Sequence, residues 1–398
     1  MARYGRMAGV FKDDKCILKY NMKVLLLYQY LNHTSTVKSL ADHLCSLGVN
    51  IECLDLPTLH FVSGKKGKYR FLQRINGILM KIGRGRRILT TRLKCNYILN
   101  QIQDFDIIDI HSYDLFYNNI IPDIKKHGKA LIIMVWGSDF YRATKEALER
   151  KRLGFAYADI IHLETESVRD DFIKVYPEFK SKIRVVPFGL DQLDRLKVSQ
   201  ESPLKEITLV SSEVYRNKLI VTCGYNGIKS QQHLLMIKAV LSLPDNIKSR
   251  LHLIVPFTYG GTEKYKKEVI DSLKNSGMPF TLLDKNLSEG EVTELRRISH
   301  IVLNIQITDS FSASLQEHMM AGSVLIVGDW LPYDVFDKAG LFTIKTSLEE
   351  LTSKLFDVVS NYEEYAKKAK LNTEKIYNLS SWSIVANKWV EIYDESLS

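Results

Sequence analysis

The chain has 398 residues, more than one ordinary hydrophobic core encloses, so its length predicts two domains. Hydrophobic residues make up 45% and charged residues 25%, which is typical of a globular protein. No apolar run approaches the roughly 20 residues that span a bilayer, which excludes a membrane-embedded chain. The formal net charge of +9 points to a polyanionic partner.

Residues 1–21 are expected to form an N-terminal extension ahead of the first strand. They lack the apolar core of a signal peptide. The five cysteines contain no C-x-x-C pair, so their spacing predicts neither a zinc site nor a disulfide frame. Both observations favour a protein of the reducing cytoplasm.

Short apolar runs alternate with amphipathic stretches over residues 22–192, the expected N-terminal domain. A helix is expected over 35–48, where apolar residues recur at helical spacing and Gly48 follows. Buried strands are expected at 23–30, 50–56, 105–112, 130–137, 159–164 and 183–189. Near-continuous apolar strands separated by helices predict a parallel sheet covered on both faces.

The same alternation restarts after a polar stretch, 193–206, that is expected to be a linker. The second domain, 207–376, has expected strands at 218–226, 250–260, 279–284, 300–306 and 323–329. Helices are expected over 231–243 and 288–299, and the latter begins with a Ser288–Glu291 capping box. The chain ends as helix, and residues 377–398 are expected to cross back to the N-terminal domain.

Residues 64–94 contain eleven Lys and Arg and no Asp or Glu. These cations are mixed with aromatic and aliphatic residues at helical spacing, which is typical of a helix lying on anionic lipid. Nucleic acid is the rival partner, but no recognition motif accompanies the charge. A solvated surface helix is the third interpretation. We expect an anionic membrane surface and no nucleic acid as partner.

The stretch "TDSFSASLQEHMMAG" follows the expected strand 300–306 and carries two acids, Asp309 and Glu317. Ligands of parallel α/β domains bind where strands end and helices begin. The expected helix start would therefore surround an anion with the N–H groups of five residues: Ser310, Phe311, Ser312, Ala313 and Ser314. A Ser-capped helix whose acids favour its dipole explains the same spacing without a ligand.

This D-x7-E pattern, followed by "MAG" and a strand, resembles the E-x7-E signature of the retaining GT-B glycosyltransferases. "RVVPFGLD", "YADIIHLETESVRDDFI" and the closing "SSWSIVANKWVEIY" resemble further parts of that family. The resemblance implies the GT-B fold, two Rossmann-like α/β domains with parallel sheets facing across a cleft. It also implies that Asp309 contacts the donor sugar and Glu317 holds the ribose. Asp309 departs from the usual Glu.

"VPFTYGG" and "MVWGSDFYR" are similar to enzymes that transfer a modified fucosamine to a lipid-linked intermediate. Those enzymes invert the anomeric centre, whereas the E-x7-E family retains it. The sequence therefore leaves the stereochemistry open, and the D-x7-E match favours retention.

Two further loops are expected to bind the donor. "CGYNGIKSQQHLL" follows a strand and opens a helix, so Gly224, Asn226 and Lys229 are candidates for the diphosphate. The family's Arg is missing from this loop, and a plain glycine turn is the alternative. After strand 279–284, the matching family loop reads the base, which implicates Asp284, Lys285 and Asn286. A surface turn explains the same three residues.

The first domain supplies the expected acceptor and catalytic residues. Asn32 and His33 replace the glycines of the family's acceptor loop. His111 ends strand 105–112; it is a catalytic candidate, although a lone His at a strand end is commonly structural. Trp136 stands where the family has His, with Arg142 as a further acceptor candidate and Asp139 as the base if the enzyme inverts.

These patterns predict a metal-independent hexosyltransferase that uses a nucleotide-sugar co-substrate and no cofactor. The expected acceptor is a lipid-linked or growing glycan of bacterial O-antigen, capsule or exopolysaccharide synthesis, and the expected location is the cytoplasmic face of the membrane. Two alternatives remain. One is a GT-B-fold sugar-nucleotide epimerase, and the other is a non-catalytic basic membrane adaptor.

Overall fold

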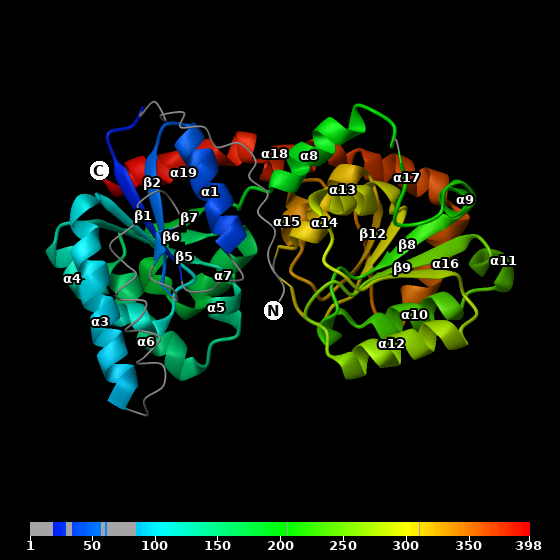
Figure 1. Cartoon of the computed structure of the whole chain (residues 1–398), viewed down its shortest axis with the longest axis horizontal. Coiled ribbons are helices and arrows are strands. Elements are labelled where there is room, and N and C mark those ends of the chain that lie inside the picture. The colour runs from blue at the N-terminus through cyan, green and yellow to red at the C-terminus, as the bar shows by residue number, and fades with distance from the viewer. Residues whose placement is uncertain (1–18, 29–33, 57–59, 62–84, 205, 310) are drawn as a thin grey trace. The chain divides into compact units, whose positions relative to one another are not determined.

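The computed structural model describes residues 19–28, 34–56, 60–61, 85–204, 206–309 and 311–398. The chain divides into two compact units, and Figure 1 shows strands and helices in both. The first unit comprises the described residues up to His162, with Phe179–Arg184 and Ala386–Ser398. The second comprises Leu163–Glu178 and Val185–Val385.

The sheet of the first unit has the order β3-β2-β1-β4-β5-β6-β7. β1 pairs in parallel with β2 and β4, and β4 with β5, whereas the short β3 is antiparallel to β2. Strands β4 and β5 are buried along their whole length, as expected for parallel strands covered by helices. The strands are β1 Lys23–Tyr28, β2 Asn50–Asp55, β3 His60–Phe61, β4 Ile107–His111, β5 Ala130–Val135, β6 Ile160–Leu163 and β7 Ile183–Val185.

The last part of the chain belongs to the core of the first unit. Trp389 and Tyr393, on α19 (Trp382–Ser396), are fully buried, and the Tyr393 hydroxyl donates to Asp109 Oδ2 at 3.0 Å. Arg184 bonds Glu395 near the end of the same helix. The other described helices of this unit are α1 Thr34–Ser46, α3 Gly85–Gln101, α4 Ile121–Lys126, α5 Ser138–Tyr141 and α6 Lys145–Tyr157.

The sheet of the second unit has the order β10-β9-β8-β11-β12-β13, and every neighbouring pair is parallel. Its strands are β8 Leu219–Cys223, β9 Leu251–Pro256, β10 Phe280–Leu283, β11 Ile301–Asn304, β12 Val324–Gly328 and β13 Ile344–Thr346. Because side chains alternate along a strand, Val221 and Leu253 point to one face of the sheet and Ile220 and Ile254 to the other.

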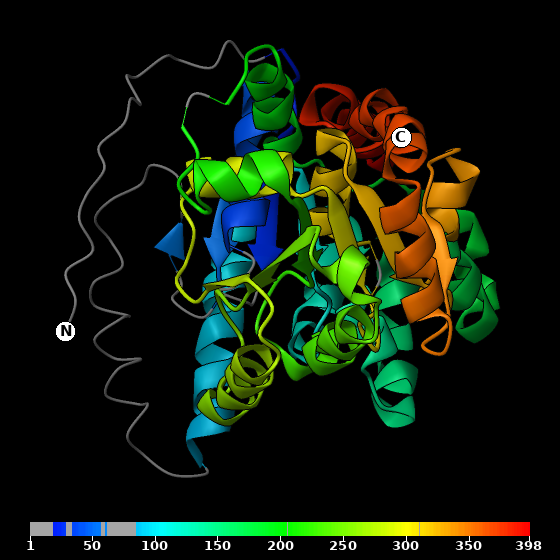
Figure 2. The ribbon, with the colours of Figure 1, turned by 90° about the vertical axis from the view of Figure 1, so that its right-hand side faces the viewer.

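Helices cover both faces of this second sheet, as Figure 2 shows from the side of this unit. One face packs on α10, α12 and α16, and the other packs on α8, α13, α14 and α15. The helices are α7 Glu166–Val175, α8 Asp191–Gln200, α9 Ser212–Asn217, α10 His233–Leu241, α11 Asp245–Lys248, α12 Glu263–Asn275, α13 Glu289–Ile298, α14 Ala313–Ala321, α15 Asp334–Lys338, α16 Leu351–Ser360, α17 Tyr362–Lys370 and α18 Asn372–Ser380.

The two expected parallel sheets are confirmed, and each expected strand is present within a few residues of its predicted ends. The capping box of α13 is also confirmed, with Ser288 and Glu291 bonding each other's backbone. The sequence did not predict β3 and β13, which have only two and three residues. The stretch expected as a linker, 193–206, is helical to Gln200 as part of α8.

The cysteines that the structure describes differ in their bonding. Cys45 is disulfide-bonded, whereas Cys53, Cys95 and Cys223 are free and buried. Spacing alone cannot reveal which distant cysteines meet in a fold.

Among the helices that the structure describes, none combines the length and apolarity needed to cross a bilayer.

Candidate functional site

Two loops meet at the carboxyl edge of the second sheet. One runs from β8 to α10 and the other from β11 to α14. The Ile307 N–H donates to the Ser230 carbonyl at 2.9 Å, and the Gln232 side chain donates to the Ile305 carbonyl. The sequence placed both loops at this edge, and the structure joins them directly.

The glycines of the β8–α10 loop are required by its packing. Gly224 has φ of +69°, and a Cβ there would lie 2.9 Å from Gln231 Oε1. A Cβ at Gly227 would lie 2.7 Å from the Phe257 ring. This agrees with the plain-turn interpretation, which needs no ligand.

Asn226 and Lys229 differ in what they offer a ligand. Asn226 is buried, and its Oδ1 accepts from the Ile228 N–H at 2.9 Å, which shapes the turn. Lys229 is exposed at the start of a 3-10 turn, Lys229–Gln231. Of these two residues, only Lys229 presents a cation to solvent.

Asp309 is the centre of a polar network at the ends of β8, β11 and β12. Its Oδ2 accepts hydrogen bonds from the Tyr333 hydroxyl and the Gln306 amide. Tyr333 in turn accepts from Asn304 Nδ2 at 2.8 Å. Gln306 Oε1 accepts from Gln231 at 2.9 Å and from the Tyr225 hydroxyl at 3.3 Å. This network fixes one oxygen of Asp309.

Both tyrosines of this network keep their protons. Burial raises the pKa of Tyr225 to about 12, with a further contribution from the Asp309 charge. Burial and the same charge hold the pKa of Tyr333 well above its ordinary value. Their hydroxyls therefore donate to acceptors around Asp309 at neutral pH.

The start of α14 is formed as the sequence predicts. Ser312 is the N-cap, and its hydroxyl accepts from the Leu315 N–H at 3.4 Å. Phe311 packs beside Phe336, with ring centroids 5.7 Å apart. Ala313 and Ser314 are the first two helical residues, whose N–H groups have no carbonyl of the helix to bond. Ser310 lies outside the described residues.

Glu317 lies one turn into α14 and is paired with Arg296 on α13. Two guanidinium nitrogens of Arg296, Nε and Nη2, lie 2.8 Å from Glu317 Oε2. The side chains are only 9% and 13% exposed, so the pair is largely shielded from water. His318 Nε2 lies 3.0 Å from the third nitrogen, Nη1.

Asp284, Lys285 and Asn286 follow β10 and are all exposed. Asp284 bonds Lys266 of α12 at 3.2 Å, and this contact lowers the pKa of its carboxyl. The surface-turn interpretation accounts for this geometry, and a role in reading the base stays a prediction.

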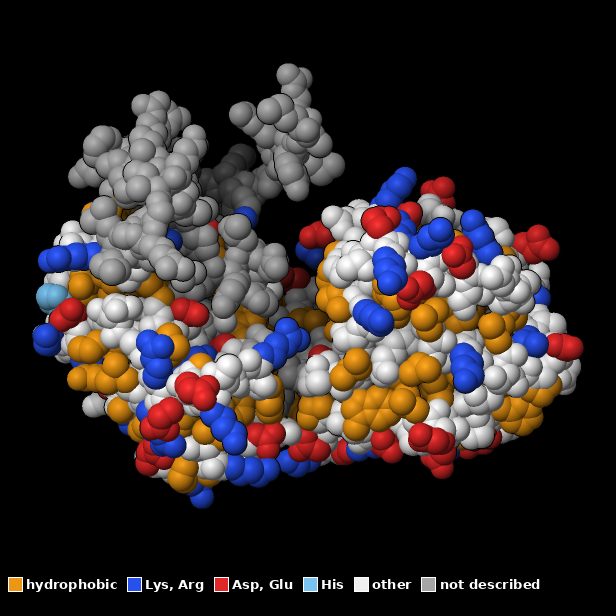
Figure 3. All heavy atoms as spheres, turned by 90° about the horizontal axis from the view of Figure 1, so that it is seen from below, with side chains coloured by type: hydrophobic (Ala, Val, Ile, Leu, Met, Phe, Trp, Pro, Cys, Tyr) orange, Lys and Arg blue, Asp and Glu red, His pale blue; other side chains and the backbone are white. Residues whose placement is uncertain are grey.

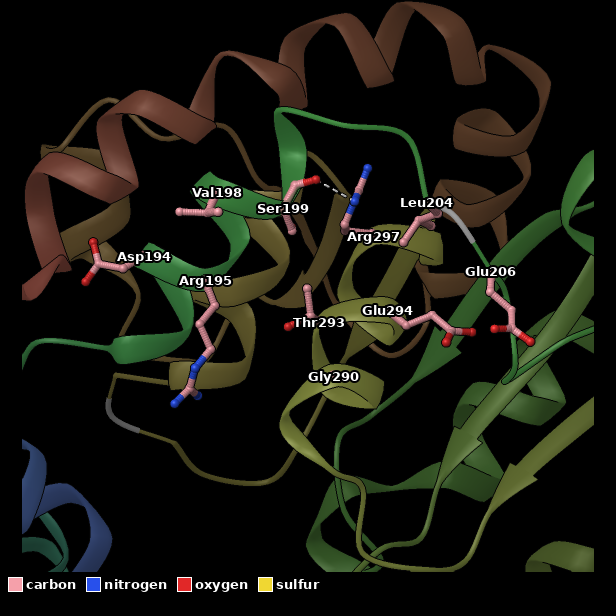
Figure 4. A pocket seen from close by; sticks show the side chains of 10 residues that line it. All are labelled: Asp194, Arg195, Val198, Ser199, Leu204, Glu206, Gly290, Thr293, Glu294 and Arg297. Atoms are coloured by element: carbon pink, nitrogen blue, oxygen red, sulfur yellow. Dashed lines mark hydrogen bonds between the residues drawn. The ribbon is translucent and has the colours of Figure 1, made fainter. Parts of the chain in front are cut away.

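A separate hollow of 610 Å³ lies between α8 and α13, and Figure 4 shows the side chains that line it. Arg297 donates to the carbonyls of Ser199 and Ser202 at 2.6 and 2.8 Å. Glu294 accepts from the N–H groups of Thr208 and Leu209 at 2.7 and 2.8 Å. These contacts hold the segment that precedes β8 against α13. None of the predicted site residues lines the hollow.

His111 is buried in the first unit, on the same face of β4 as Asp109. Its Nε2 lies 3.2 Å from Asp109 Oδ2, which also accepts from Tyr393. The Trp389 ring stacks on the His111 ring, with ring centroids 5.9 Å apart. His111 is fully buried, so the structure favours the structural interpretation over contact with a sugar.

Asp139 joins the loops that follow β4 and β5. Its two oxygens accept from the N–H groups of Tyr113 and Trp136, each at 2.8 Å. Burial raises the pKa of its carboxyl to about 6, although Lys151 and these N–H donors act in the opposite direction. Lys151 is itself buried and bonds the Asp139 carbonyl at 2.6 Å. A carboxylate with this pKa is suited to accept a proton near neutral pH.

The other first-domain candidates are less defined. Trp136 is half-buried and Arg142 is exposed, both close to Asp139 along the chain. Asn32 and His33 lie outside the described residues. So do residues 64–84, most of the basic segment, of which α3 includes residues 85–94.

Sequence reasoning missed Tyr333, Gln306, Arg296 and Lys151. Tyr333, Arg296 and Lys151 contact partners 24, 21 and 12 positions away, so no local spacing marks them, whereas Gln306 lies three positions before Asp309. The available signal was positional for two of them, because Gln306 and Tyr333 follow expected strands at the ligand-binding edge.

No protein-family model and no curated protein matches the chain. Solved structures do match. A glycosyltransferase from Rickettsia africae ESF-5 aligns with a TM-score of 0.71 and 15% identity, over 95% of this chain and 100% of that one. HepE of Anabaena in complex with UDP-glucose aligns with a TM-score of 0.65 and 12% identity, over 94% and 99%. The chain has the GT-B fold.

The GT-B fold alone does not decide the activity. A putative UDP-N-acetylglucosamine 2-epimerase from Listeria monocytogenes also aligns, with a TM-score of 0.58 and 16% identity over 94% of this chain and 96% of that one. At such identities the likeness establishes the fold, and the chemistry has to be argued from the site.

Proposed function

We propose that the protein is a glycosyltransferase that takes a sugar from a nucleotide-sugar donor. The observation that carries this proposal is the position of Asp309 and Glu317, which flank the start of α14 where β11 ends. Free N–H groups at a helix start favour an anion such as a diphosphate. Likeness to the solved glycosyltransferase from Rickettsia africae ESF-5 and to HepE in complex with UDP-glucose supports the proposal.

The second unit would hold the donor. Glu317 would accept hydrogen bonds from the ribose, and Asp309 from the sugar. Lys229 and the N–H groups of Ala313 and Ser314 would neutralise the leaving diphosphate, which is the role a metal has in other transferases. We propose metal-independent transfer on this basis. Asp284, Lys285 and Asn286 would lie beside the base.

The first unit would hold the acceptor. Asp139, with its raised pKa, is the base we propose if the anomeric centre inverts. If it is retained, Asp309 contacts the reacting sugar and Asp139 keeps the two loops in place. The D-x7-E spacing favours retention. Trp136 and Arg142 would contact the acceptor.

We further propose a lipid-linked glycan of bacterial surface polysaccharide synthesis as acceptor, and a position on the cytoplasmic face of the membrane. The support is the charge of residues 64–94. On the described surface seen in Figure 3, cationic and anionic side chains are interspersed. The membrane proposal therefore draws its support from residues 64–94 and not from the face seen there.

Epimerisation of the sugar nucleotide is the second candidate, because the aligned Listeria structure is described as a putative epimerase. An epimerase needs no acceptor. Incubating the protein with the donor alone and following the sugar by NMR separates the two, since only an epimerase would produce a new stereoisomer still bound to the nucleotide.

The first test is calorimetric binding and thermal shift with UDP-, GDP- and dTDP-sugars, for the wild type and Glu317→Ala. We expect one nucleotide to bind selectively and the variant to lose most of this affinity. A folded wild-type protein that binds none of them would refute the donor site and leave the basic membrane adaptor as the better explanation.

A further inference from the structure

We infer that Arg296 is a positioning residue that fixes Glu317 for nucleotide binding. The inference rests on the proposed function and adds a residue on α13 that the D-x7-E pattern does not contain. It is carried by the contacts that surround Glu317.

The guanidinium group occupies one carboxylate oxygen completely. Arg296 Nε and Nη2 both lie 2.8 Å from Glu317 Oε2. The Nε–H group donates a charge-assisted hydrogen bond, with Nη2 in ion-pair contact beside it, and such a contact is strong and directional where water is largely excluded. The side chain of Glu317 is therefore held in one orientation before any ligand arrives.

The other oxygen, Oε1, is the one available to a ligand. No described residue forms a hydrogen bond with Glu317 Oε1, and the Glu317 side chain is 13% exposed. A carboxylate oxygen is an acceptor, and a ribose hydroxyl is a donor. Fixing the carboxylate in advance lowers the conformational cost of binding that hydroxyl.

Arg296 is itself held from the far side. Its Nη1 lies 3.0 Å from His318 Nε2, and His318 Nδ1 lies 3.4 Å from the Ser323 hydroxyl. The Ser323 hydroxyl donates to the Ser299 carbonyl at 2.8 Å. Burial, reinforced by the Arg296 charge, holds the pKa of His318 well below its ordinary value. A neutral His318 accepts from Arg296 and donates to Ser323, so every contact has a donor and an acceptor.

This arrangement distinguishes Arg296 from a phosphate-binding arginine. All three guanidinium nitrogens already have protein partners, and Arg296 is 8% exposed. Its effect on the ligand must therefore pass through Glu317. The substitution should weaken nucleotide binding only while Glu317 is present.

The test compares Arg296→Lys with Arg297→Lys. Arg297 is its neighbour on α13 and, among the described residues, bonds the carbonyls of Ser199 and Ser202 and no carboxylate, so it controls for the loss of an arginine from the same helix. Affinity is measured by calorimetry for the nucleoside diphosphate, UDP, GDP or dTDP, that the wild type binds, at a temperature where every variant is folded. We expect Arg296→Lys to weaken binding about tenfold and Arg297→Lys to leave it unchanged.

A double-mutant cycle completes the test. In the Glu317→Ala background, adding Arg296→Lys should cause no further loss of affinity. Additive losses, or wild-type affinity in Arg296→Lys, would overturn the inference. If Arg296→Lys does not fold, His318→Gln replaces it, since it loosens Arg296 without touching Glu317; unchanged affinity would again overturn the inference. Failure of the proposed function looks different, because the wild type itself would then bind no nucleotide.

Discussion

Asp309 and Asp139 are both carboxylates at the ends of buried strands, but their surroundings give them different properties. Asp309 receives side-chain donors, Tyr333 and Gln306, that themselves belong to a larger network. Asp139 receives two backbone N–H groups, and desolvation of its carboxyl raises its pKa to about 6 in spite of them. The first arrangement orients a charge, and the second retains a proton at mildly acidic pH.

The hydroxyl of Tyr333 is expected to contribute to binding of the donor sugar. Tyr333→Phe removes a donor to Asp309 and the acceptor of Asn304. We expect a loss of about 1 to 3 kcal/mol in the free energy of unfolding, since buried polar groups are left unpaired. Calorimetry should show weaker binding of the nucleotide-sugar and unchanged binding of the nucleoside diphosphate. Equal weakening of both ligands would contradict a role at the sugar.

The pH dependence of stability should reveal the raised pKa of Asp139. Its pKa is raised in the folded protein, so the folded state binds more protons than the unfolded state between about pH 4 and pH 6. The contribution of Asp139 to stability is therefore fully present below pH 4 and is lost as the pH rises through 6. Asp139→Asn should flatten this part of the profile, measured by urea unfolding. A variant with the slope of the wild type would contradict the raised pKa.

At the scale of the elements, strands and helices were largely predictable because each carries its own hydrophobic period. β5 is a fully buried apolar run, β4 is a buried strand whose isoleucines alternate with Asp109 and His111 at its end, and the residues of the α13 capping box can be recognised in the sequence. The short β13 was not predicted, since its sequence IKT is not an apolar run and only its last residue is buried. The partners of the site residues could not be predicted from the sequence either, because Arg296 and Glu317 meet only where α13 packs on α14.

The β8–α10 loop provides a prediction at this scale. In Gly227→Ala the new Cβ would lie 2.7 Å from the buried Phe257 ring and 3.1 Å from Gly261 Cα. We expect a loss of about 1 to 3 kcal/mol in the free energy of unfolding, because the ring or the loop must move. Thermal or urea unfolding measures it.

Gly290→Ala is the control for that experiment. Gly290 is a helical residue of α13, and no described atom lies within 4 Å of the place that an alanine Cβ would take. Alanine should therefore be neutral there or stabilise the protein by up to about 1 kcal/mol. Equal losses at both glycines would show that the Phe257 contact is not the cause.

At the scale of the whole molecule, the sequence predicted two Rossmann-like domains and a final helix that returns to the first. In the described residues, Ala386–Ser398 belongs to the first unit. The sequence did not predict what the returning segment does there. It supplies Trp389 and Tyr393 to a buried polar cluster around Asp109 and His111.

That cluster predicts that removing the Tyr393 hydroxyl lowers the free energy of unfolding. Tyr393→Phe leaves the buried Asp109 carboxylate with one donor fewer. We expect a loss of about 1 to 3 kcal/mol in the free energy of unfolding, with nucleotide binding by the second unit unchanged. Chemical denaturation and calorimetry measure the two effects separately. Unchanged stability would mean that water or another group replaces the hydroxyl.

The place of Ala386–Ser398 in the first unit also has a consequence for biosynthesis. The strands β1 to β6 leave the ribosome early, but Trp389 and Tyr393 of their core follow the second unit along the chain. The nascent first unit must therefore remain incomplete while the second is synthesised, with apolar surface open to chaperones. A premature stop codon between the second unit and Trp389 would then damage the part of the protein that was made first.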